Sequence, residues 1–439
     1  MAKVCMISLG CAKNLVNSEQ MLCMLDDAGL EIVNDPEGAD VAIVNTCGFI
    51  NDAKVEAIDH ILYLSQLKDQ GRLGKIIVAG CLSQRYQTDI TDEIPEVDAV
   101  MGTGSYDNIV QIVASVLNTN DRYSSFHDID KANDEYGRII TTGSKWAYLK
   151  IAEGCSNCCA FCVIPSIRGK YRSRSMTSVI SEAKELVKSG YRELIVIAQD
   201  ITRYGTDLYK KKMLCELLRE LCGIEDLKWI RLHYLYPELI DDELISLVAS
   251  EEKILKYLDI PIQHINTPIL KSMNRRGTGD DIRALIKKLR ANIPGLVLRT
   301  SIIAGLPGEG EAEFEELCEF LREAKIQRAG VFPYSPEEGT PAAEMDRPDE
   351  ETAQARAERL FELQMEIMDE YNLSRVGTVC EVLCEGYDED YNCWYGRSYA
   401  ESPDIDGRIL FNGDGVEPDE FYNVRITEIT DGEPFGERV

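Results

Sequence analysis

Three cysteines at positions 155, 159 and 162, the central triad, have the spacing C-x3-C-x2-C, and no other feature constrains this chain as much. Three thiolates in one short loop suit a soft metal centre, and iron–sulfur clusters are held by such sets. A cubane cluster has four irons, so three thiolates leave one iron for a ligand that is not protein. Two alternatives stay open: a structural zinc site with Cys158 as the fourth thiolate, and thiols that bind no metal.

Composition limits the class of protein further. The 439 residues suffice for two or three domains, each with its own core. The formal charge of −29 disfavours phosphate backbones and anionic lipid, and it favours basic partners. The 15 cysteines, with no secretory segment before them, predict metal ligation and reduced thiols rather than disulfides. No run of about 18 uncharged apolar residues occurs, so we expect a cytoplasmic protein without a membrane span.

Residues 1–118 are predicted to form a parallel α/β domain. Short runs rich in Val and Ile occur at residues 3–9, 41–46 and 75–79, and a helical pattern follows each of them. Strands that alternate with helices in this way are typical of a parallel sheet with crossover helices.

Cys11, Cys47 and Cys81, the N-terminal triad, follow these three runs. Ligands of an open α/β sheet collect outside the carboxyl ends of its strands, so the fold would bring the three thiols to one edge. A glycine lies beside each cysteine and would let backbone approach a bulky cluster. The pattern leaves open whether these thiols bind a metal or are ordinary buried cysteines.

Residues 119–144 are polar and are expected to form a linker. The central domain, residues 145–373, has six strand patterns separated by helical ones, at residues 146–151, 193–198, 229–234, 257–260, 296–303 and 330–332. Six βα units are too few to close an eight-stranded barrel. We therefore expect a partial (β/α)6 barrel whose open side admits a macromolecule.

Sites in such barrels lie at the carboxyl ends of the strands. The cysteine loop follows the first strand, and later strands end near Gln199, at His233 and His264, and at the turn Gly305–Glu309. The two histidines are either polar site residues or core residues with satisfied hydrogen bonds, and we favour the core interpretation. The basic run Arg168–Arg174 follows the cysteine loop and either meets an anionic cofactor or lies in solvent.

The last domain, residues 374–439, has short strand patterns at residues 378–383, 395–399, 409–411 and 421–428. They predict a small antiparallel β-barrel of the oligonucleotide-binding type. Residues 381–439 hold 16 acidic residues and four arginines, with no lysine. Counterion release cannot drive RNA binding on such a surface, so a partner rich in lysine and arginine fits better.

The C-x3-C-x2-C motif, with Phe161 before its last cysteine, resembles the radical S-adenosylmethionine (SAM) superfamily. The longer run at residues 153–169 resembles its methylthiotransferase branch. Ser8–Asn14 and Gly396–Gly407 resemble, more narrowly, the ribosomal-protein methylthiotransferases. The resemblance covers essentially the whole chain and implies an N-terminal methylthiotransferase domain, a radical SAM barrel and a terminal TRAM domain.

This resemblance implies two [4Fe–4S] clusters, one on each triad, with SAM at the open iron of the central one. One electron would cleave SAM to a 5′-deoxyadenosyl radical, which takes a hydrogen from an unactivated carbon. The N-terminal cluster would present sulfur, and a second SAM would methylate it. Cofactor contacts are expected from Phe161, Gln199, Gly305, Pro307 and Gly308.

Substrates of the resembled family are an aspartate on a small-subunit ribosomal protein or an adenosine in transfer RNA. The acidic last domain favours the basic ribosomal protein over nucleic acid, and transfer RNA is the alternative. The expected electron donor is a flavodoxin or ferredoxin. A non-catalytic iron–sulfur carrier or sensor is a third hypothesis, although a carrier needs no cofactor cradle such as Gly305–Glu309. Cys158 departs from the family pattern, and we expect it to bind no iron.

Overall fold

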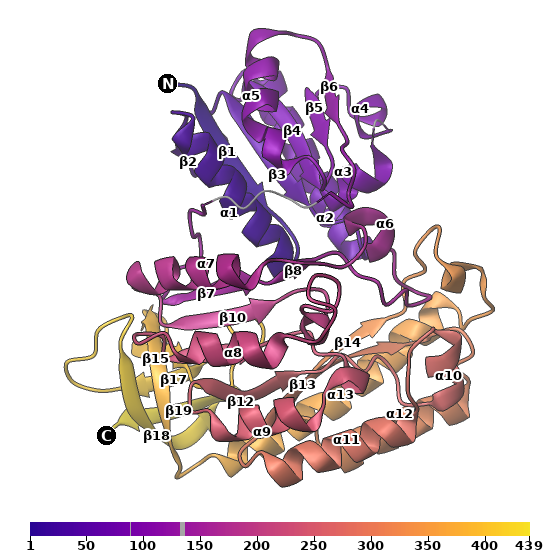
Figure 1. Ribbon diagram of the computed structural model, residues 1–439, viewed down its shortest axis with the longest axis vertical. Coiled ribbons are helices and arrows are strands. Elements are labelled where there is room, and N and C mark those ends of the chain that lie inside the picture. The colour runs from indigo at the N-terminus through magenta and orange to yellow at the C-terminus, as the bar shows by residue number, and fades with distance from the viewer. Residues whose placement is uncertain (88, 132–136) are drawn as a thin grey trace.

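The computed structural model describes residues 1–87, 89–131 and 137–439 of the chain. The N-terminal domain stands on one end of the central domain, and a small C-terminal barrel lies at the side of the central domain (Figure 1). Within these ranges no helix is both long enough and apolar enough to cross a lipid bilayer. Residues 132–136, in the segment expected to be a linker, lie outside the described residues.

The N-terminal sheet has six parallel strands in the order β2-β1-β3-β4-β5-β6. Strand β3 is buried at every position, as expected for a parallel sheet that helices cover on both faces. The strands are β1 (Lys3–Ser8), β2 (Glu31–Val33), β3 (Val41–Thr46), β4 (Lys75–Gly80), β5 (Ala99–Met101) and β6 (Tyr123–Ser125). The predicted strands correspond to β1, β3 and β4, whereas the other three have three residues each, too few for a sequence pattern.

Strand β6 pairs in parallel with β5, so the sheet continues into the segment that was expected to be a linker. The helices of this domain are α1 (Ala12–Asp27), α2 (Asn51–Asp69), α3 (Cys81–Tyr86), α4 (Asp89–Glu93) and α5 (Ile109–Asn118), with a 3-10 turn η1 (Tyr106–Asn108). Helices α1, α2 and α3 follow β1, β3 and β4 and start at the same edge of the sheet.

The central domain is an open sheet of six parallel strands in the order β14-β13-β12-β11-β10-β7. These are β7 (Trp146–Lys150), β10 (Glu193–Ile197), β11 (Trp229–Leu232), β12 (Ile254–Asp259), β13 (Val297–Ala304) and β14 (Arg328–Pro333). All six coincide with predicted strands, and the sheet is not closed, as expected for a partial barrel. A two-stranded ribbon of β8 (Ala152–Glu153) and β9 (Arg172–Ser173) lies at its edge.

Helices cover the outer face of this sheet and bury one large apolar core with it. Several of their N-termini carry side-chain caps, such as the capping box of Thr278 and Asp281 at the start of α11. The helices are α6 (Ile164–Arg168), α7 (Met176–Lys188), α8 (Leu214–Cys222), α9 (Asp242–Ser250), α10 (Thr267–Ser272), α11 (Gly279–Asn292), α12 (Glu311–Ala324) and α13 (Glu350–Ser374), with 3-10 turns η2 (Ile201–Arg203), η3 (Pro237–Leu239) and η4 (Pro341–Glu344).

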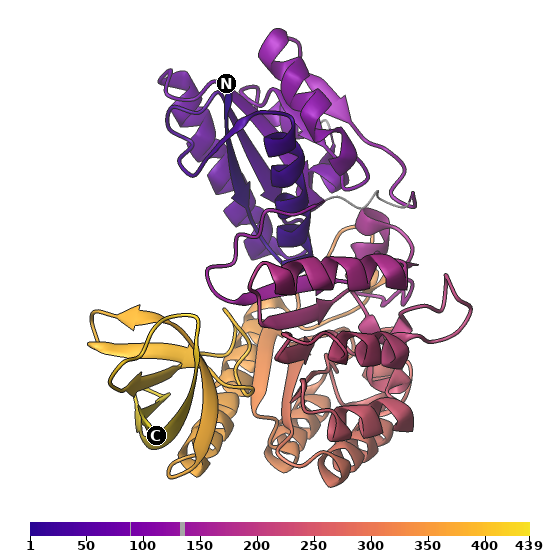
Figure 2. The same cartoon turned by 60° about the vertical axis from the view of Figure 1, so that its left-hand side comes forward.

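The C-terminal domain is a closed barrel of β15 (Val379–Asp388), β16 (Cys393–Arg397), β17 (Ile409–Asn412), β18 (Phe421–Thr430) and β19 (Glu433–Arg438). Its pairs are antiparallel except for β17 with β19, and β19 has no counterpart among the predicted strands. Figure 2 shows the barrel beside the strands of the central domain and away from the N-terminal domain.

One loop of the C-terminal barrel, residues 398–406, lies against the inner face of the central sheet. The Arg231 guanidinium donates to the carbonyl of Tyr399 at 2.8 Å, and the hydroxyl of Ser402 lies 3.0 Å from Nε2 of His233. Glu401, buried in this loop, lies 3.2 Å from the guanidinium of Arg328. The run that carries the narrow family resemblance therefore contains the loop that covers the inside of the partial barrel.

Candidate iron–sulfur and cofactor site

The N-terminal triad is assembled by three βα turns. Cys11 is the N-cap residue of α1, Cys47 follows β3, and Cys81 is the first residue of α3. The backbone N–H groups of Lys13 and Asn14 lie close enough to the Cys11 thiol to lower its pKa. The charges of Cys11 and Cys81 act on Cys47, and the charge of Cys11 acts on Cys81, as expected of neighbouring groups. The three cysteines therefore lie at one edge of the sheet, as predicted.

A buried hydrogen-bond network joins these turns. The side-chain amide of Asn14 donates to the carbonyls of Leu9 and Asn45, at 2.7 and 3.0 Å. The Asn45 amide donates to Ser18 Oγ at 2.8 Å, and that hydroxyl donates to Ser8 Oγ at 2.8 Å. The motif Ser8–Asn14 thus fixes the β1 turn against the β3 turn, and with it Cys11 against Cys47.

Glycines allow the turns to approach one another closely. Gly10 has φ of +85°, and a Cβ there would lie 2.6 Å from the Cβ of Cys47. A Cβ at Gly48 would lie 2.8 Å from the backbone nitrogen of Leu82. We expected these glycines to make room for a cluster, but their nearest neighbours are atoms of the adjacent turns. They therefore serve the packing of the edge on which the cysteines lie.

Arg168 is the charge at the centre of this edge. It is 2% exposed and lies 3.0 Å from Glu153 Oε1, and it also donates to Asn14 Oδ1 and Asn17 Oδ1, both at 3.2 Å. Burial raises the pKa of the Cys11 thiol, but the charges of Lys13 and Arg168 outweigh this and leave that pKa below its ordinary value.

The other two thiols of the N-terminal triad behave differently. Burial raises the pKa of Cys81 despite the opposing charge of Arg168. Burial also raises the pKa of Cys47 to about 11. One of the three sulfurs is therefore predisposed to the thiolate form that binds metal.

The central triad lies in the loop that follows β7 and β8. Asn157 holds this loop, because its amide donates to Asp200 Oδ2 at 2.8 Å and its oxygen accepts from Arg203 Nε at 2.7 Å. Cys158 has φ of +53°, an exposed side chain, and a carbonyl that accepts from the amide of Asn274 at 2.7 Å. Its thiol points to solvent, whereas the thiols of Cys155 and Cys159 are buried.

Cys159 is contacted by two side chains from distant parts of the chain. The Tyr236 hydroxyl lies 3.1 Å from its sulfur, and the Arg275 guanidinium lies 3.8 Å from it. Arg275 also stacks over the Tyr236 ring. Burial raises the pKa of Cys155 to about 11, and it raises the pKa of Cys162 as well.

The residues expected to contact a cofactor surround this loop unevenly. Phe161 packs in one buried cluster with Leu306 and Tyr334, which brings the β13 turn to the cysteine loop. The amide of Gln199 donates to Glu153 Oε1 at 3.0 Å, while its own oxygen is buried without a partner. Pro307 is buried and Gly308 is exposed, next to open space.

Gly305 has a full set of contacts within the chain. Its N–H donates to Glu309 Oε1 at 2.9 Å, and a Cβ at this position would lie 2.4 Å from the Cβ of Ala353 in α13. These contacts account for a glycine at 305 without any ligand. Glu309 also lies 3.1 Å from His264 Nε2, so this part of the turn is braced internally. His233 and His264 are both buried and both bonded, in agreement with the core role we assigned to them.

Helix α6 connects the two triads. It begins two residues after Cys162, and Val163 and Ile167 pack against Cys81 and Phe49 in one apolar cluster. The Thr103 hydroxyl donates to the carbonyl of Ile167 at 2.6 Å. The five-residue helix and Arg168 at its end thus link the central cysteine loop to the N-terminal cysteine edge. Figure 1 shows α6 at the junction of the two domains.

Each triad supplies three cysteine thiolates, and such a donor set suits an iron–sulfur cluster. Among the described residues, no three His, Cys, Asp or Glu side chains converge closely enough for a single metal ion. A cubane cluster binds each thiolate through a different iron, so its ligands lie farther apart than those of one ion. Some of the buried oxygens without a partner lie beside the triads: Tyr106 Oη near the N-terminal one, and Gln199 Oε1 and Tyr334 Oη near the central one. A group that the polypeptide does not supply would complete their bonding.

Several site residues gave no signal in the sequence. Tyr236 and Arg275 reach Cys159 from other βα loops, and Lys13 lies 3.3 Å over the ring of Tyr234. Arg168 was noted only as part of a basic run. In the structure it is buried between the triads, whereas Lys170 of the same run is exposed. Only the fold brings these groups together.

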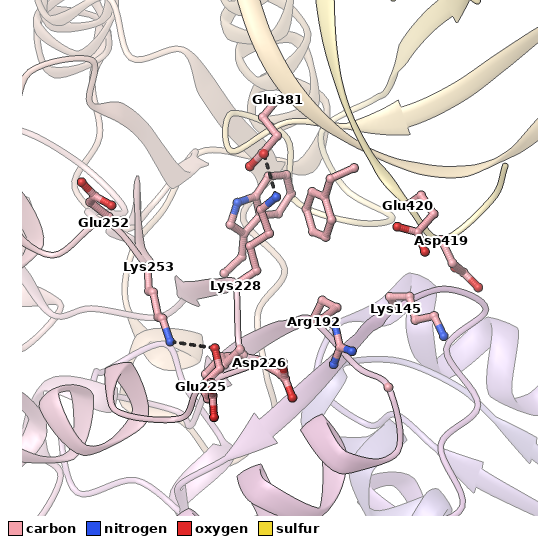
Figure 3. Close-up of a pocket in the computed structure, with 14 residues that line it drawn as sticks. Lys145, Arg192, Glu225, Asp226, Lys228, Glu252, Lys253, Glu381, Asp419 and Glu420 are labelled. Atoms are coloured by element: carbon pink, nitrogen blue, oxygen red, sulfur yellow. Dashed lines mark hydrogen bonds and ion pairs between the residues drawn. The ribbon is translucent and has the colours of Figure 1, made fainter. Parts of the chain in front are cut away.

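A large cavity of about 580 Å³ lies elsewhere (Figure 3). It separates the C-terminal barrel from the amino ends of the central strands, where Lys145, Arg192 and Lys253 meet Glu381 and Glu420. This is the opposite end of the sheet from the cysteine loop. Its mixed charges, including the Lys228–Glu381 ion pair at 2.6 Å, mark a wet domain boundary rather than the reaction site.

Three family models match the chain in succession. Residues 3–102 match the uncharacterized protein family UPF0004, residues 149–321 the radical SAM superfamily, and residues 376–439 the TRAM domain. These ranges coincide with the three folded domains.

Full-length relatives agree with the domain matches. The chain is 48% identical to the ribosomal protein uS12 methylthiotransferase RimO of Acetivibrio thermocellus, over 99% of this chain and 98% of that protein. It is 46% identical to the protein of the same name from Clostridioides difficile, over 100% and 99%. Among solved structures, the radical SAM methyltransferase TsrM of Kitasatospora setae shares the fold, with a TM-score of 0.56 and 15% identity over 76% of this chain and 75% of that one.

Proposed function

Because the chain belongs to the RimO family of ribosomal protein uS12 methylthiotransferases, we propose that it adds a methylthio group to the β-carbon of an aspartate in uS12. The observation that supports this best is the pair of cysteine triads joined through α6 and Arg168. One triad serves radical formation and the other serves sulfur, and the reaction needs both near one substrate carbon. A ribosomal protein as substrate also implies that the enzyme acts in the cytoplasm.

We assign one [4Fe–4S] cluster to Cys11, Cys47 and Cys81 and the other to Cys155, Cys159 and Cys162. When bound, the clusters and SAM supply the radical chemistry and the sulfur. Phe161, Gln199, Pro307 and Gly308 border the central loop and are proposed to hold SAM. Gly305 is proposed to act through its neighbours, since its N–H is bonded to Glu309.

The chain's own residues hold the central loop in place and keep it dry. Asn157 and Asp200 fix the loop, and Arg275 with Tyr236 covers Cys159. Removal of water from such a site strengthens each electrostatic contact inside it. The Glu153 carboxylate accepts from Arg168, Lys150 and Gln199. Burial raises the pKa of Glu153, but the charges of Arg168 and Lys150 outweigh this and keep that pKa well below its ordinary value. It therefore stays ionised as the anchor between the two sites.

The C-terminal barrel supports a basic protein substrate. Two of its four arginines face carboxylates: Arg397 lies 2.9 Å from Glu193, and Arg408 lies 2.7 Å from Asp388. The exposed acids of the barrel remain, including Glu389, Asp414 and Glu437. Such a surface attracts a lysine- and arginine-rich protein and repels a phosphate backbone.

The decisive experiment offers both substrates to the reconstituted enzyme with SAM and a reduced flavodoxin or ferredoxin. We expect mass spectrometry to find a methylthio group in place of one hydrogen on an aspartate of uS12. Methylthioadenosine in transfer RNA, with unmodified uS12, would contradict the assignment. A variant with Cys11, Cys47 and Cys81 changed to alanine is the control, since it should make neither product while still cleaving SAM.

The acidic barrel can be tested separately. The change Glu389→Gln/Asp414→Asn/Glu437→Gln removes three exposed charges from the barrel, far from both triads. We expect uS12 to bind this variant more weakly and with a smaller dependence on salt, while SAM cleavage without substrate is unchanged. Unchanged uS12 binding would contradict the proposed role of the barrel.

A further inference from the structure

The apex of the central cysteine loop is the point where the site reaches the surface. Ser156 and Cys158 are exposed, although Cys155 and Cys159 on either side of them are buried. This apex is held from two sides. The N–H of Tyr171 donates to Ser156 Oγ at 3.1 Å, and the amide of Asn274 donates to the Cys158 carbonyl at 2.7 Å.

Exposed cations flank this apex on both sides. Lys170 precedes Tyr171, and Lys271 and Arg276 lie on either side of Asn274. All three side chains are exposed, and none forms an ion pair in the parts of the chain that the structure describes. The contacts that fix the apex thus bring the two segments that carry these three cations next to it.

Two acids near these cations, Asp130 and Glu238, also interact with other groups of the chain. Asp130 accepts from the N–H of Lys170 at 2.7 Å and lies 3.6 Å from the guanidinium of Arg172. Glu238 is partly buried, and burial raises its pKa although the charges of Arg275 and Arg276 oppose that rise. The surface at the apex is therefore positive, on a chain whose formal charge is −29.

We propose that Lys170, Lys271 and Arg276 form the docking surface for an acidic one-electron carrier, which delivers its electron through the apex Ser156–Cys158. This rests on the proposed function, because the site needs an electron only if the central triad holds a reducible cluster. The carrier is oxidised by one electron and the cluster is reduced by one. Charge complementarity selects the occupant, since a basic ribosomal protein would be repelled here and attracted to the acidic C-terminal barrel.

The geometry suits a brief encounter rather than a stable complex. Redox partners bind through small interfaces, and attraction between opposite charges raises their rate of association. A short, exposed segment next to two buried ligands brings a docked carrier close to the central triad. The acidic remainder of the protein would turn such a carrier away from other surfaces.

The test compares two charge reversals of equal size. The variant Lys170→Glu/Lys271→Glu/Arg276→Glu changes the docking surface. The control Lys184→Glu/Lys188→Glu/Lys287→Glu changes three exposed lysines on the outer helices α7 and α11 by the same total charge. Each protein receives its electron either from dithionite, a small reductant that needs no docking surface, or from reduced flavodoxin. Binding of flavodoxin to each protein is measured directly at low and high salt.

We expect all three proteins to cleave SAM at equal rates with dithionite. With flavodoxin, the docking-surface variant should cleave SAM about tenfold more slowly than wild type, and it should bind the carrier more weakly. High salt should reduce the difference in carrier binding between this variant and wild type. Equal losses in both variants, or full binding by the docking-surface variant, would overturn the proposal. If wild type did not cleave SAM with dithionite, the proposed function would fail, and the binding titration would still decide whether this surface binds the carrier.

Discussion

The two cysteine triads reach similar donor sets by different routes. The central triad occupies positions 155, 159 and 162 of a single loop, so its spacing is local. The N-terminal triad takes one cysteine from each of three βα turns and exists only when the sheet is folded. A local motif survives disturbance of distant contacts, whereas an assembled site depends on the network and glycines that hold the turns together.

The triads also differ in their charge environment. Buried Arg168 and Lys13 lower the pKa of Cys11, whereas burial raises the pKa of Cys47 and Cys81 in the same triad and of Cys155 and Cys162 in the central triad. The assembled site therefore has one thiol whose pKa is lowered by nearby cations, whereas in the central loop the pKa of Cys155 and Cys162 stays raised although Arg275 lies 3.8 Å from Cys159. Changes that separate these two features should affect the two sites differently.

Removal of one triad at a time should have the largest effect. Cys11→Ala/Cys47→Ala/Cys81→Ala should reduce iron from about eight to about four per chain, abolish the methylthio product and retain SAM cleavage. Cys155→Ala/Cys159→Ala/Cys162→Ala should also leave about four irons but abolish SAM cleavage. Iron and sulfide analysis under anaerobic conditions checks both. About four irons in wild type and in the N-terminal variant would mean that the N-terminal cysteines are structural.

Replacement of Arg168 should weaken the assembled site first. Arg168→Met keeps much of the side-chain volume but leaves its carboxylate and amide partners without the cation, at a cost of about 3 kcal/mol in the free energy of unfolding. We expect loss of iron from the N-terminal triad and retention at the central one, measured by urea unfolding and by iron content. Equal iron loss from both sites would show that Arg168 supports the central loop to the same degree.

Two glycines allow the energetic cost of close packing to be measured separately from the cost of backbone strain. Gly10 and Gly29 have φ of +85° and +80°, but a Cβ would meet neighbours within 4 Å only at Gly10, the nearest at 2.6 Å. Gly29→Ala should cost about 1 kcal/mol of stability, and Gly10→Ala about 3 kcal/mol, with loss of N-terminal iron. Chemical denaturation of the two variants checks this, and equal costs would mean that the turns can move apart.

The thiols of the assembled site should titrate in a fixed order. The pKa of Cys11 lies below its ordinary value and that of Cys47 is raised to about 11, so at a given pH Cys11 holds more thiolate. In the reduced, iron-free protein, iodoacetamide should modify Cys11 at lower pH than Cys47, although both are half-buried. Peptide mass spectrometry across pH 7 to about 9 gives the order, and prior reaction of Cys47 would contradict it.

Cys158→Ser should have the smallest effect. The thiol is exposed and its nearest bond is a 3.8 Å contact with the carbonyl of Ser156. We expect unchanged iron content and unchanged SAM cleavage. A loss of iron would make Cys158 a ligand and reopen the assignment of the central triad.

The sequence allowed much of this to be predicted for a physical reason. All six central strands were predicted because apolar runs recur with helices between them, and the edge that collects Cys11, Cys47 and Cys81 follows from βα topology. Strands β2, β5 and β6 were missed because three residues carry no periodicity. Arg275 and Tyr236 at Cys159, and Arg168 between the triads, depend on packing across domains and loops, which local patterns do not encode.

The loop at residues 398–406 sets the order in which this protein can be completed during synthesis. The buried cations Arg231 and Arg328 on the central strands are satisfied in part by the carbonyl of Tyr399 and the carboxylate of Glu401. Until those residues leave the ribosome, the inner face of the partial barrel holds charges that lack these partners. The inner face of the central sheet is therefore complete only when the last tenth of the chain is present.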